Sequence, residues 1–205
     1  MSLKTNITKL DEMLNGGIKE NTSAIILSTP WIKSLQLIQQ IVYGNLKNNK
    51  VIYISLNAKP SIIREIFKEY DWDISSFEKK RQIEIINAYN EVIHKKKPEE
   101  IHRLILDNIN KAKSNAIIVI DSISSFLDSF GTDKKRLEEV KEWIKTSKKA
   151  TLIALLTNWP YKDSILKMLR SEFDCVINLK TMEKEIILRN YLLVSKAKWI
   201  KNLKK

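Results

Sequence analysis

The pair Lys33-Ser34 has the residue types that close a phosphate-binding loop, and it lies where an apolar run turns into an amphipathic pattern. Such a loop binds phosphate through converging backbone N–H groups, and glycine lets the backbone approach the ligand. Residues 28–32 contain no glycine. The sequence therefore has the lysine and the hydroxyl residue of a phosphate-binding loop, but the residues before them are poorly suited to forming the backbone part of that loop.

The spacing of the loop shows where glycine is missing. In the pattern G-x-x-x-x-G-K-[ST], the two glycine positions are occupied by Leu27 and Ile32. A β-branched residue at positive φ is an outlier that costs roughly 1–3 kcal/mol. Pro30 and the bulky Trp31 precede Ile32. We expect this segment to take another path, with Trp31 or Ile32 filling the space of a phosphate, or with the turn opening outward.

The elements that must position this loop alternate along the chain. Short β-branched runs predict strands at 24–27, 51–56, 83–86, 116–120, 151–156, 175–179, 185–188 and 191–194. Amphipathic helical patterns lie between the first five runs, and one of them carries Leu35, Ile38 and Ile41 on one face. The sequence predicts an α/β fold: a mostly parallel sheet with helices on both faces. The last two runs follow each other closely and predict an antiparallel hairpin at the C-terminal end.

In an open parallel sheet, ligands bind beyond the carboxyl ends of the strands. The segments that follow the predicted strands are therefore the candidate binding segments. They are residues 28–34, 57–60, 121–125 and 157–160.

Composition limits the classes of protein. The 205 residues suit a single domain, 1–205, with a lead-in at 1–22 and a basic tail at 196–205. Cys175 is the only cysteine, which excludes an intramolecular disulfide and suits a reducing cytoplasm. The polar N-terminus does not resemble a signal peptide, and the apolar runs are too short for membrane insertion. The net charge of +12 favours anionic partners, or reflects a solvated lysine-rich surface.

Residues 5–28 resemble the opening of KaiC-like ATPases, a branch of the RecA superfamily of P-loop proteins. The matching residues are Thr5, Ile7, Leu10, Asp11, Leu14, Gly16, Gly17 and Ile18. Further segments resemble the following strands in order: VIYISL, IEIINAY, AIIVIDSISSF, LIALLTN, FDCVINL and YLLVSKAK. The resemblance covers nearly the whole chain and implies a RecA-like fold with a degenerate Walker A loop.

The resemblance also implies roles for particular residues. The nucleotide-binding loop would comprise Ser28, Thr29, Pro30, Trp31, Ile32, Lys33 and Ser34. Lys33 would contact the phosphates, and Ser34 and Asp121 would hold Mg²⁺. The alternative is a solvated Lys33, a plain helical Ser34, and an Asp121 that caps the following helix.

The catalytic position differs from that of many relatives, which carry two glutamates that activate water after the second strand. Asn57 and Ala58 occupy those positions here. Neither can act as a general base, and losing that base removes about 10²–10⁴ in rate. We therefore expect ATP hydrolysis to be lost.

Some relatives present a Lys-x-Arg finger from the last strand to the nucleotide of a neighbouring subunit. The matching positions hold Lys196 and Lys198. Lysine supplies a point charge rather than the two-pronged contact of arginine. Equally, the two lysines can protect an edge strand from aggregation.

These residues favour a catalytically degenerate KaiC-like ATPase homologue, a regulatory or scaffolding subunit with weak or no nucleotide binding. No cofactor is expected, and ATP with Mg²⁺ is the ligand pair if the site is retained. The expected partner is a protein, in a hetero-complex. Two alternatives stay open. One is a slow ATPase that uses Lys33, Ser34 and Asp121. The other is a recombinase paralogue that binds single-stranded DNA through basic residues near Trp199.

Charge predicts the state of assembly. Without a bridging nucleotide, lysines brought together between subunits repel one another. We expect a monomer or a hetero-complex rather than a nucleotide-stabilised hexamer, and light scattering measures this. Binding to single-stranded DNA, if it occurs, should weaken steeply with salt, because exposed charges are screened over about 8 Å at physiological ionic strength. A stable homohexamer without ligand would contradict this expectation.

Overall fold

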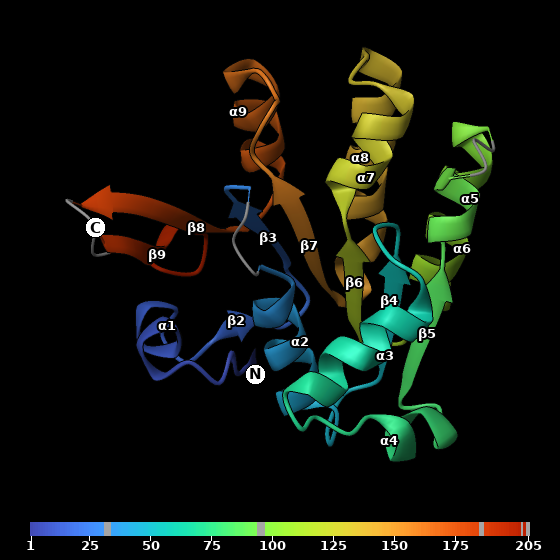
Figure 1. The fold of residues 1–205 in the computed structure, drawn as a ribbon, viewed down its shortest axis with the longest axis vertical. Coiled ribbons are helices and arrows are strands. Elements are labelled where there is room, and N and C mark those ends of the chain that lie inside the picture. Colours follow the sequence, from blue (N-terminus) through green and yellow to red (C-terminus); the bar gives the residue numbers. More distant parts are fainter. Residues whose placement is uncertain (31–33, 94–96, 185–186, 202, 204–205) are drawn as a thin grey trace.

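A seven-stranded, mostly parallel sheet organises the chain (Figure 1). The computed structural model describes residues 1–30, 34–93, 97–184, 187–201 and 203. The strand order is β5-β4-β6-β7-β3-β8-β9. The strands are β3 (Ser23–Ser28), β4 (Val51–Ser55), β5 (Ile83–Asn87), β6 (Ile117–Asp121), β7 (Thr151–Thr157), β8 (Cys175–Lys184) and β9 (Ile187–Ala197). A separate antiparallel pair, β1 (Ser2–Leu3) and β2 (Ile18–Lys19), lies within the N-terminal lead-in.

Helices cover both faces of the sheet, as the sequence predicts (Figure 1). One face packs against α1 (Thr8–Met13), α2 (Ser34–Asn45), α3 (Pro60–Glu69) and α4 (Ser75–Lys79). The other packs against α6 (Pro98–Lys111), α7 (Ile123–Phe130), α8 (Lys134–Thr146) and α9 (Asp163–Glu172). The short helix α5 (Tyr89–Ile93) follows β5, and a 3-10 turn, η1 (Ser147–Lys149), leads into β7.

Each central strand contributes side chains to both cores. In β6, Ile118 and Ile120 pack on the α6–α9 face, whereas Ile117 and Val119 pack on the α1–α4 face. All of these side chains are buried. This double burial explains why the strand is apolar at every position rather than at alternate ones.

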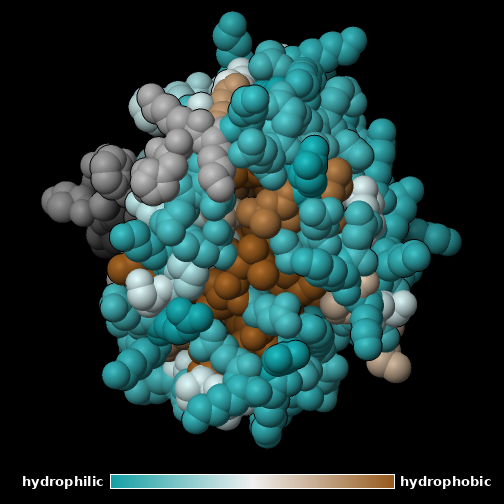
Figure 2. Space-filling model, turned by 90° about the vertical axis from the view of Figure 1, so that its right-hand side faces the viewer, coloured by the Kyte–Doolittle hydropathy of each residue, from teal (hydrophilic) through white to brown (hydrophobic). Residues whose placement is uncertain are grey.

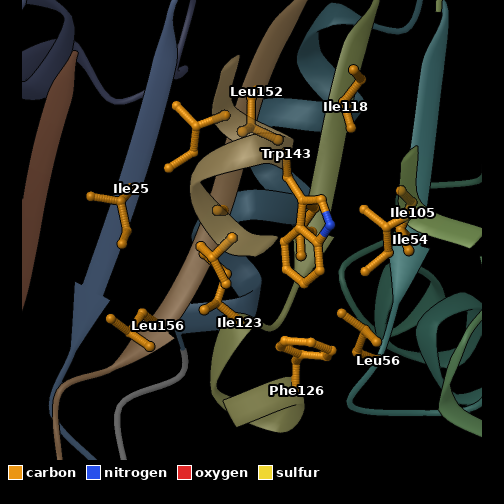
Figure 3. Packing of buried hydrophobic residues seen from close by; sticks show 14 of the residues in the cluster. Ile25, Ile54, Leu56, Ile105, Ile118, Ile123, Phe126, Trp143, Leu152 and Leu156 are labelled. Atoms are coloured by element: carbon orange, nitrogen blue, oxygen red, sulfur yellow. The ribbon is translucent and has the colours of Figure 1, made fainter. Parts of the chain in front are cut away.

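Trp143 of α8 lies at the centre of the core on the α6–α9 face (Figure 3). Its ring meets the ring of Phe126 at a centroid distance of 4.9 Å. Its indole Nε1–H donates to Nδ1 of His102 at 2.9 Å, so the polar atom of the buried ring is satisfied.

The C-terminal antiparallel hairpin is present, but its strands differ from those predicted. We expected residues 185–188 to pair with 191–194. Instead β9 includes both 187–188 and 191–194, and it pairs antiparallel with β8. Asn190, which lies between the two predicted strands, pairs with Thr181, and Thr181 Oγ1 donates to Asn190 Oδ1 at 2.9 Å. A polar pair at the exposed end of a hairpin preserves the ladder without apolar burial.

None of the helices in the described ranges has the length and apolar character needed to cross a membrane.

Two tryptophans offer a matched test of the packing. Trp143 is fully buried, whereas Trp159 is 70% exposed. We expect Trp143→Ala to lower the free energy of unfolding by about 3–5 kcal/mol, because the truncation leaves a cavity. Trp159→Ala should change it by no more than about 0.5 kcal/mol. Urea denaturation measures both, and equal losses would show that the core is not centred on Trp143.

Candidate functional site

The carboxyl ends of four neighbouring strands, β4, β6, β7 and β3, open into one polar cavity of about 300 Å³. Its lining consists of Ser28, Thr29, Pro30, Ser34, Leu35, Asn57, Ser122, Ser124, Ser125, Asp128, Leu155 and Thr157. Each of the four segments expected beyond the strand ends contributes at least one residue to it. The parallel sheet thus brings together the segments that the sequence singled out.

The loop between β3 and α2 places the hydroxyl end of the candidate phosphate site. Ser34 is buried at the first position of α2 and lines the cavity. Thr29 extends the pairing of β3, because its N–H donates to the carbonyl of Leu179 at 3.1 Å. That N–H is therefore engaged within the sheet. Trp31, Ile32 and Lys33 lie outside the described residues, so the path expected for them stays a prediction.

Asp121 ends β6 and is fully buried. Its Oδ2 accepts a hydrogen bond from the hydroxyl of Tyr53 at 3.0 Å. Its Oδ1 has no hydrogen-bond partner among the described residues. Burial raises the pKa of the Asp121 carboxyl to about 6, and the Tyr53 hydrogen bond opposes that rise. Burial, with the neighbouring carboxylate, also raises the pKa of Tyr53, which keeps its hydroxyl a donor.

Asp121 does not cap the helix that follows it. The N-cap of α7 is Ser122, whose Oγ accepts from the N–H of Ser125 at 3.2 Å. The capping alternative for Asp121 is therefore wrong. The physical reason is direction: the Asp121 side chain points to Tyr53 on β4 and leaves the helix terminus to its neighbour.

The position of the expected catalytic base holds an amide. Asn57 is exposed directly beyond β4, and its Oδ1 accepts from Ser125 Oγ at 3.3 Å. The carbonyl of Ala58 accepts from Ser55 Oγ at 2.7 Å, which holds the turn against the strand. Neither residue provides a carboxylate at this point of the cavity.

The carboxylate that does line the cavity is Asp128, which sequence reasoning missed. Its Oδ1 accepts from the hydroxyl of Tyr161 at 2.5 Å. Burial and this carboxylate raise the pKa of Tyr161, so its hydroxyl remains protonated. Helical spacing could have revealed it, because Ser124, Ser125 and Asp128 share one face of the helix after Asp121.

The cavity and its surroundings contain oxygen atoms of the kind that bind Mg²⁺. Magnesium takes oxygen ligands, and the Ser34 hydroxyl in the lining is one such group. The unpartnered Oδ1 of Asp121 is another, but Asp121 is fully buried and does not belong to the lining. The described lining contains no lysine or arginine, and Lys33 lies outside the described residues. Within those residues no cluster of three or more acidic, histidine or cysteine side chains could hold a metal alone. A metal there would complete its ligands with water or with phosphate oxygens.

The two lysines of the expected finger are held within their own chain. Lys196 Nζ donates to the carbonyls of Arg170 and Ser171 at 3.1 and 2.8 Å, near the end of α9. Lys198 Nζ meets Asp174 Oδ1 at 2.6 Å. A contact with a neighbouring subunit would require these bonds to break, and that role stays a prediction.

Comparison with known proteins shows which family the sequence matches and which proteins it resembles. The sequence matches the family model described as ATPase: KaiC over residues 3–205. A UPF0273 protein of Pyrococcus horikoshii is 29% identical over 99 residues, which are 48% of this chain and 40% of that protein. The chain thus aligns with less than half the length of this curated relative.

Two solved structures share the fold. A KaiC-like protein from Pyrococcus horikoshii superposes with a TM-score of 0.78 at 23% identity, covering 100% of this chain and 92% of the other. The flagellar accessory protein FlaH from Methanocaldococcus jannaschii superposes with a TM-score of 0.75 at 18% identity, covering 96% and 88%. At these identities the likeness shows the fold alone.

The buried carboxyl of Asp121 predicts a pH dependence of stability. Its pKa rises from 3.8 to about 6 on folding, so the folded state holds a proton that the unfolded state has released between these values. Stability should therefore fall as pH rises through this window, by about 3 kcal/mol in total. Asp121→Asn removes the titration. Its free energy of unfolding relative to wild type should rise by about that amount between pH ~4 and ~7, as measured by urea denaturation.

Tyr53→Phe is the matched control, because the Tyr53 hydroxyl lowers the pKa of Asp121. Its removal should extend the fall in stability to higher pH. A difference between wild type and Asp121→Asn that stays constant with pH would show that Asp121 does not titrate in this window.

Proposed function

Because the chain belongs to the KaiC ATPase family, we propose that it is a member that has lost ATP hydrolysis and acts as a regulatory or scaffolding subunit. The observation that carries the proposal is Asn57, an amide hydrogen-bonded to Ser125 at the position where many relatives carry a glutamate. An amide cannot accept a proton from the attacking water at neutral pH. The site therefore favours binding without turnover.

The remaining carboxylates near the cavity support this proposal. Asp128 accepts a hydrogen bond from Tyr161, and Asp121 accepts one from Tyr53 and is fully buried. A general base must lie within hydrogen-bond reach of the water that it activates. Each carboxylate already accepts a hydrogen bond from a tyrosine, and among the described contacts of Asn57 there is a bond to Ser125 but none to either carboxylate. We therefore propose that neither replaces the missing glutamate.

Residual nucleotide binding is consistent with the polar lining. Ser34 and Asp121 Oδ1 would hold Mg²⁺, and Lys33 would contact phosphate. The absence of glycine from residues 28–32 weakens the backbone cradle. We therefore propose weak ATP binding or none. The ATPase alternative rests on the same Ser34 and Asp121 Oδ1, which the altered loop leaves in place.

The proposed setting is a cytoplasmic hetero-complex. One structural neighbour is a flagellar accessory protein, and an accessory role suits a domain that binds rather than turns over substrate. The DNA-binding alternative has less support, since Trp199 Nε1–H donates to the carbonyl of Leu14 at 3.1 Å. That indole is held by its own chain and is not presented for stacking on a base.

Two measurements test the proposal. Phosphate release at saturating ATP should not exceed background, and Lys33→Ala should leave it unchanged. Lys47→Ala, which removes an exposed lysine beyond α2, controls for the lost charge. Calorimetry with ATP, with and without Mg²⁺, should show dissociation constants above about 1 mM, where binding free energy is only about −4 kcal/mol. A hydrolysis rate that falls about tenfold or more in Lys33→Ala alone would establish an active ATPase and refute the proposal.

A further inference from the structure

The strand β5 forms one edge of the sheet, and its outer side pairs with no strand among the described residues. Its inner side pairs in parallel with β4, from Ile83 opposite Val51 to Asn87 opposite Ser55. An edge strand presents a row of unused backbone donors and acceptors, which is a template for another strand.

The register with β4 shows which backbone groups face outward. Val51 N–H donates to the carbonyl of Gln82, and Ala88 N–H donates to the carbonyl of Ser55. In a parallel ladder, alternate residues of a strand bond to the same neighbour. The backbone hydrogen bonds to β4 are therefore made by Gln82, Glu84, Ile86 and Ala88. The N–H and carbonyl groups of Ile83, Ile85 and Asn87 point away from it.

Apolar side chains surround this open edge. Figure 2 looks onto this side of the molecule and shows a hydrophobic hollow at its centre, bordered by hydrophilic residues. Ile85 and Ile86 of β5 are only half-buried. On the α3 side, Ile62 is 43% exposed and Ile66 is half-buried. An added strand would cover apolar surface as well as satisfy backbone groups.

The edge also lacks the features that usually prevent strand addition. Exposed edges are commonly protected by lysine, proline or a bulge. β5 contains no lysine or proline, and its one charged residue, Glu84, lies 3.4 Å from Lys50 of the neighbouring loop. At the opposite edge, β9 carries Lys196, and its pairing with β8 has a register shift near Val176. Within the described part of the chain, the β9 edge is thus protected and the β5 edge is open.

Charge indicates the kind of strand that would fit. Three exposed cations, Lys79, Lys80 and Arg81, lie just before the start of β5. The neighbouring Glu78 is already paired with Arg64 at 2.9 Å. A second copy of this chain would bring a net charge of +12 against the same charge, which opposes association. An acidic segment would be attracted instead.

We propose that the β5 edge binds an extended, acidic segment of a partner protein by strand addition. The main-chain groups of Ile83, Ile85 and Asn87 pair with that segment, alternate apolar side chains of the segment cover the hollow, and its acidic end meets Lys79, Lys80 and Arg81. None of the residues that line the polar cavity belongs to β5, so this surface is independent of nucleotide binding and of the loss of hydrolysis.

The probe is a short synthetic peptide of alternating valine and threonine with a run of glutamates at one end. Matched peptides have the same composition with the alternation scrambled, or lysines in place of the glutamates. Fluorescence anisotropy with the full chain should show that the first peptide binds about tenfold or more tightly than either control. Amide hydrogen exchange at Ile83, Ile85 and Asn87 should slow when this peptide is added.

Two variants isolate the two parts of the surface. Ile85→Pro removes an outward N–H that β4 does not use, and edge strands tolerate proline at such positions. It should weaken peptide binding about tenfold, whereas Ile85→Val should not. Lys79→Glu with Lys80→Glu should also weaken binding. Lys148→Glu with Lys149→Glu, an equal charge change at exposed positions in η1, should leave it unchanged.

The outcomes distinguish an acidic partner segment from a second copy of this chain at the β5 edge. Failure of the alternating peptide to bind, or binding that Ile85→Pro leaves intact with unchanged amide exchange, would overturn the proposal. If Ile85→Pro does not fold, amide hydrogen exchange of the wild-type chain with and without peptide tests the proposal by itself. Slow exchange at these amides without peptide, together with a dimer in light scattering, would assign the edge to a second copy and also overturn it. These results do not depend on ATP hydrolysis, so they stand apart from the proposed function.

Discussion

The double burial of the central strands is the constraint on which the rest of the structure depends. With helices on both faces, the side chains of β6 from Ile117 to Ile120 have no access to water. Burying a polar group there without a partner would cost several kcal/mol, so the strands are apolar along their length. Polar chemistry is confined to the points where the strands end. The four central strands end side by side, and residues at or just beyond these ends line a single cavity.

Asp121 lies where the buried part of β6 ends and polar residues begin. It is the carboxylate at the end of the most buried strand, and Tyr53 on the next strand satisfies only one of its oxygens. A buried carboxylate is stable when it is protonated, paired or bound to a cation. The Tyr53 contact fixes the direction of the Asp121 side chain. Burial of its carboxylate costs stability, and a cation bound at the unpartnered oxygen would reduce that cost. This is the physical link between the fold and any residual nucleotide binding.

The same sheet has two unlike edges and a polar carboxyl end. Its carboxyl end retains hydroxyls suited to a polar ligand but has an amide at Asn57 in place of a base. Among the described residues, its β5 edge has backbone groups that no strand uses, beside apolar side chains. At the opposite edge, lysines in and just after β9 are held by Arg170, Ser171 and Asp174. A protein that binds a partner needs only a suitable surface. The proposed binding role therefore rests on these surfaces rather than on a catalytic residue.

The sequence by itself determined the order of strands and helices, the parallel sheet and the segments that meet beyond it, because apolar periodicity is a local property of the chain. It also showed Asn57 and Ala58 in the catalytic positions. It did not show that β9 continues through Asn190, that Asp121 points to Tyr53, or that Asp128 lines the cavity. Nor could it show that the β5 edge is open. Each of these features depends on contacts between residues distant in the chain, and only the tertiary structure decides which neighbour a side chain or a strand edge meets.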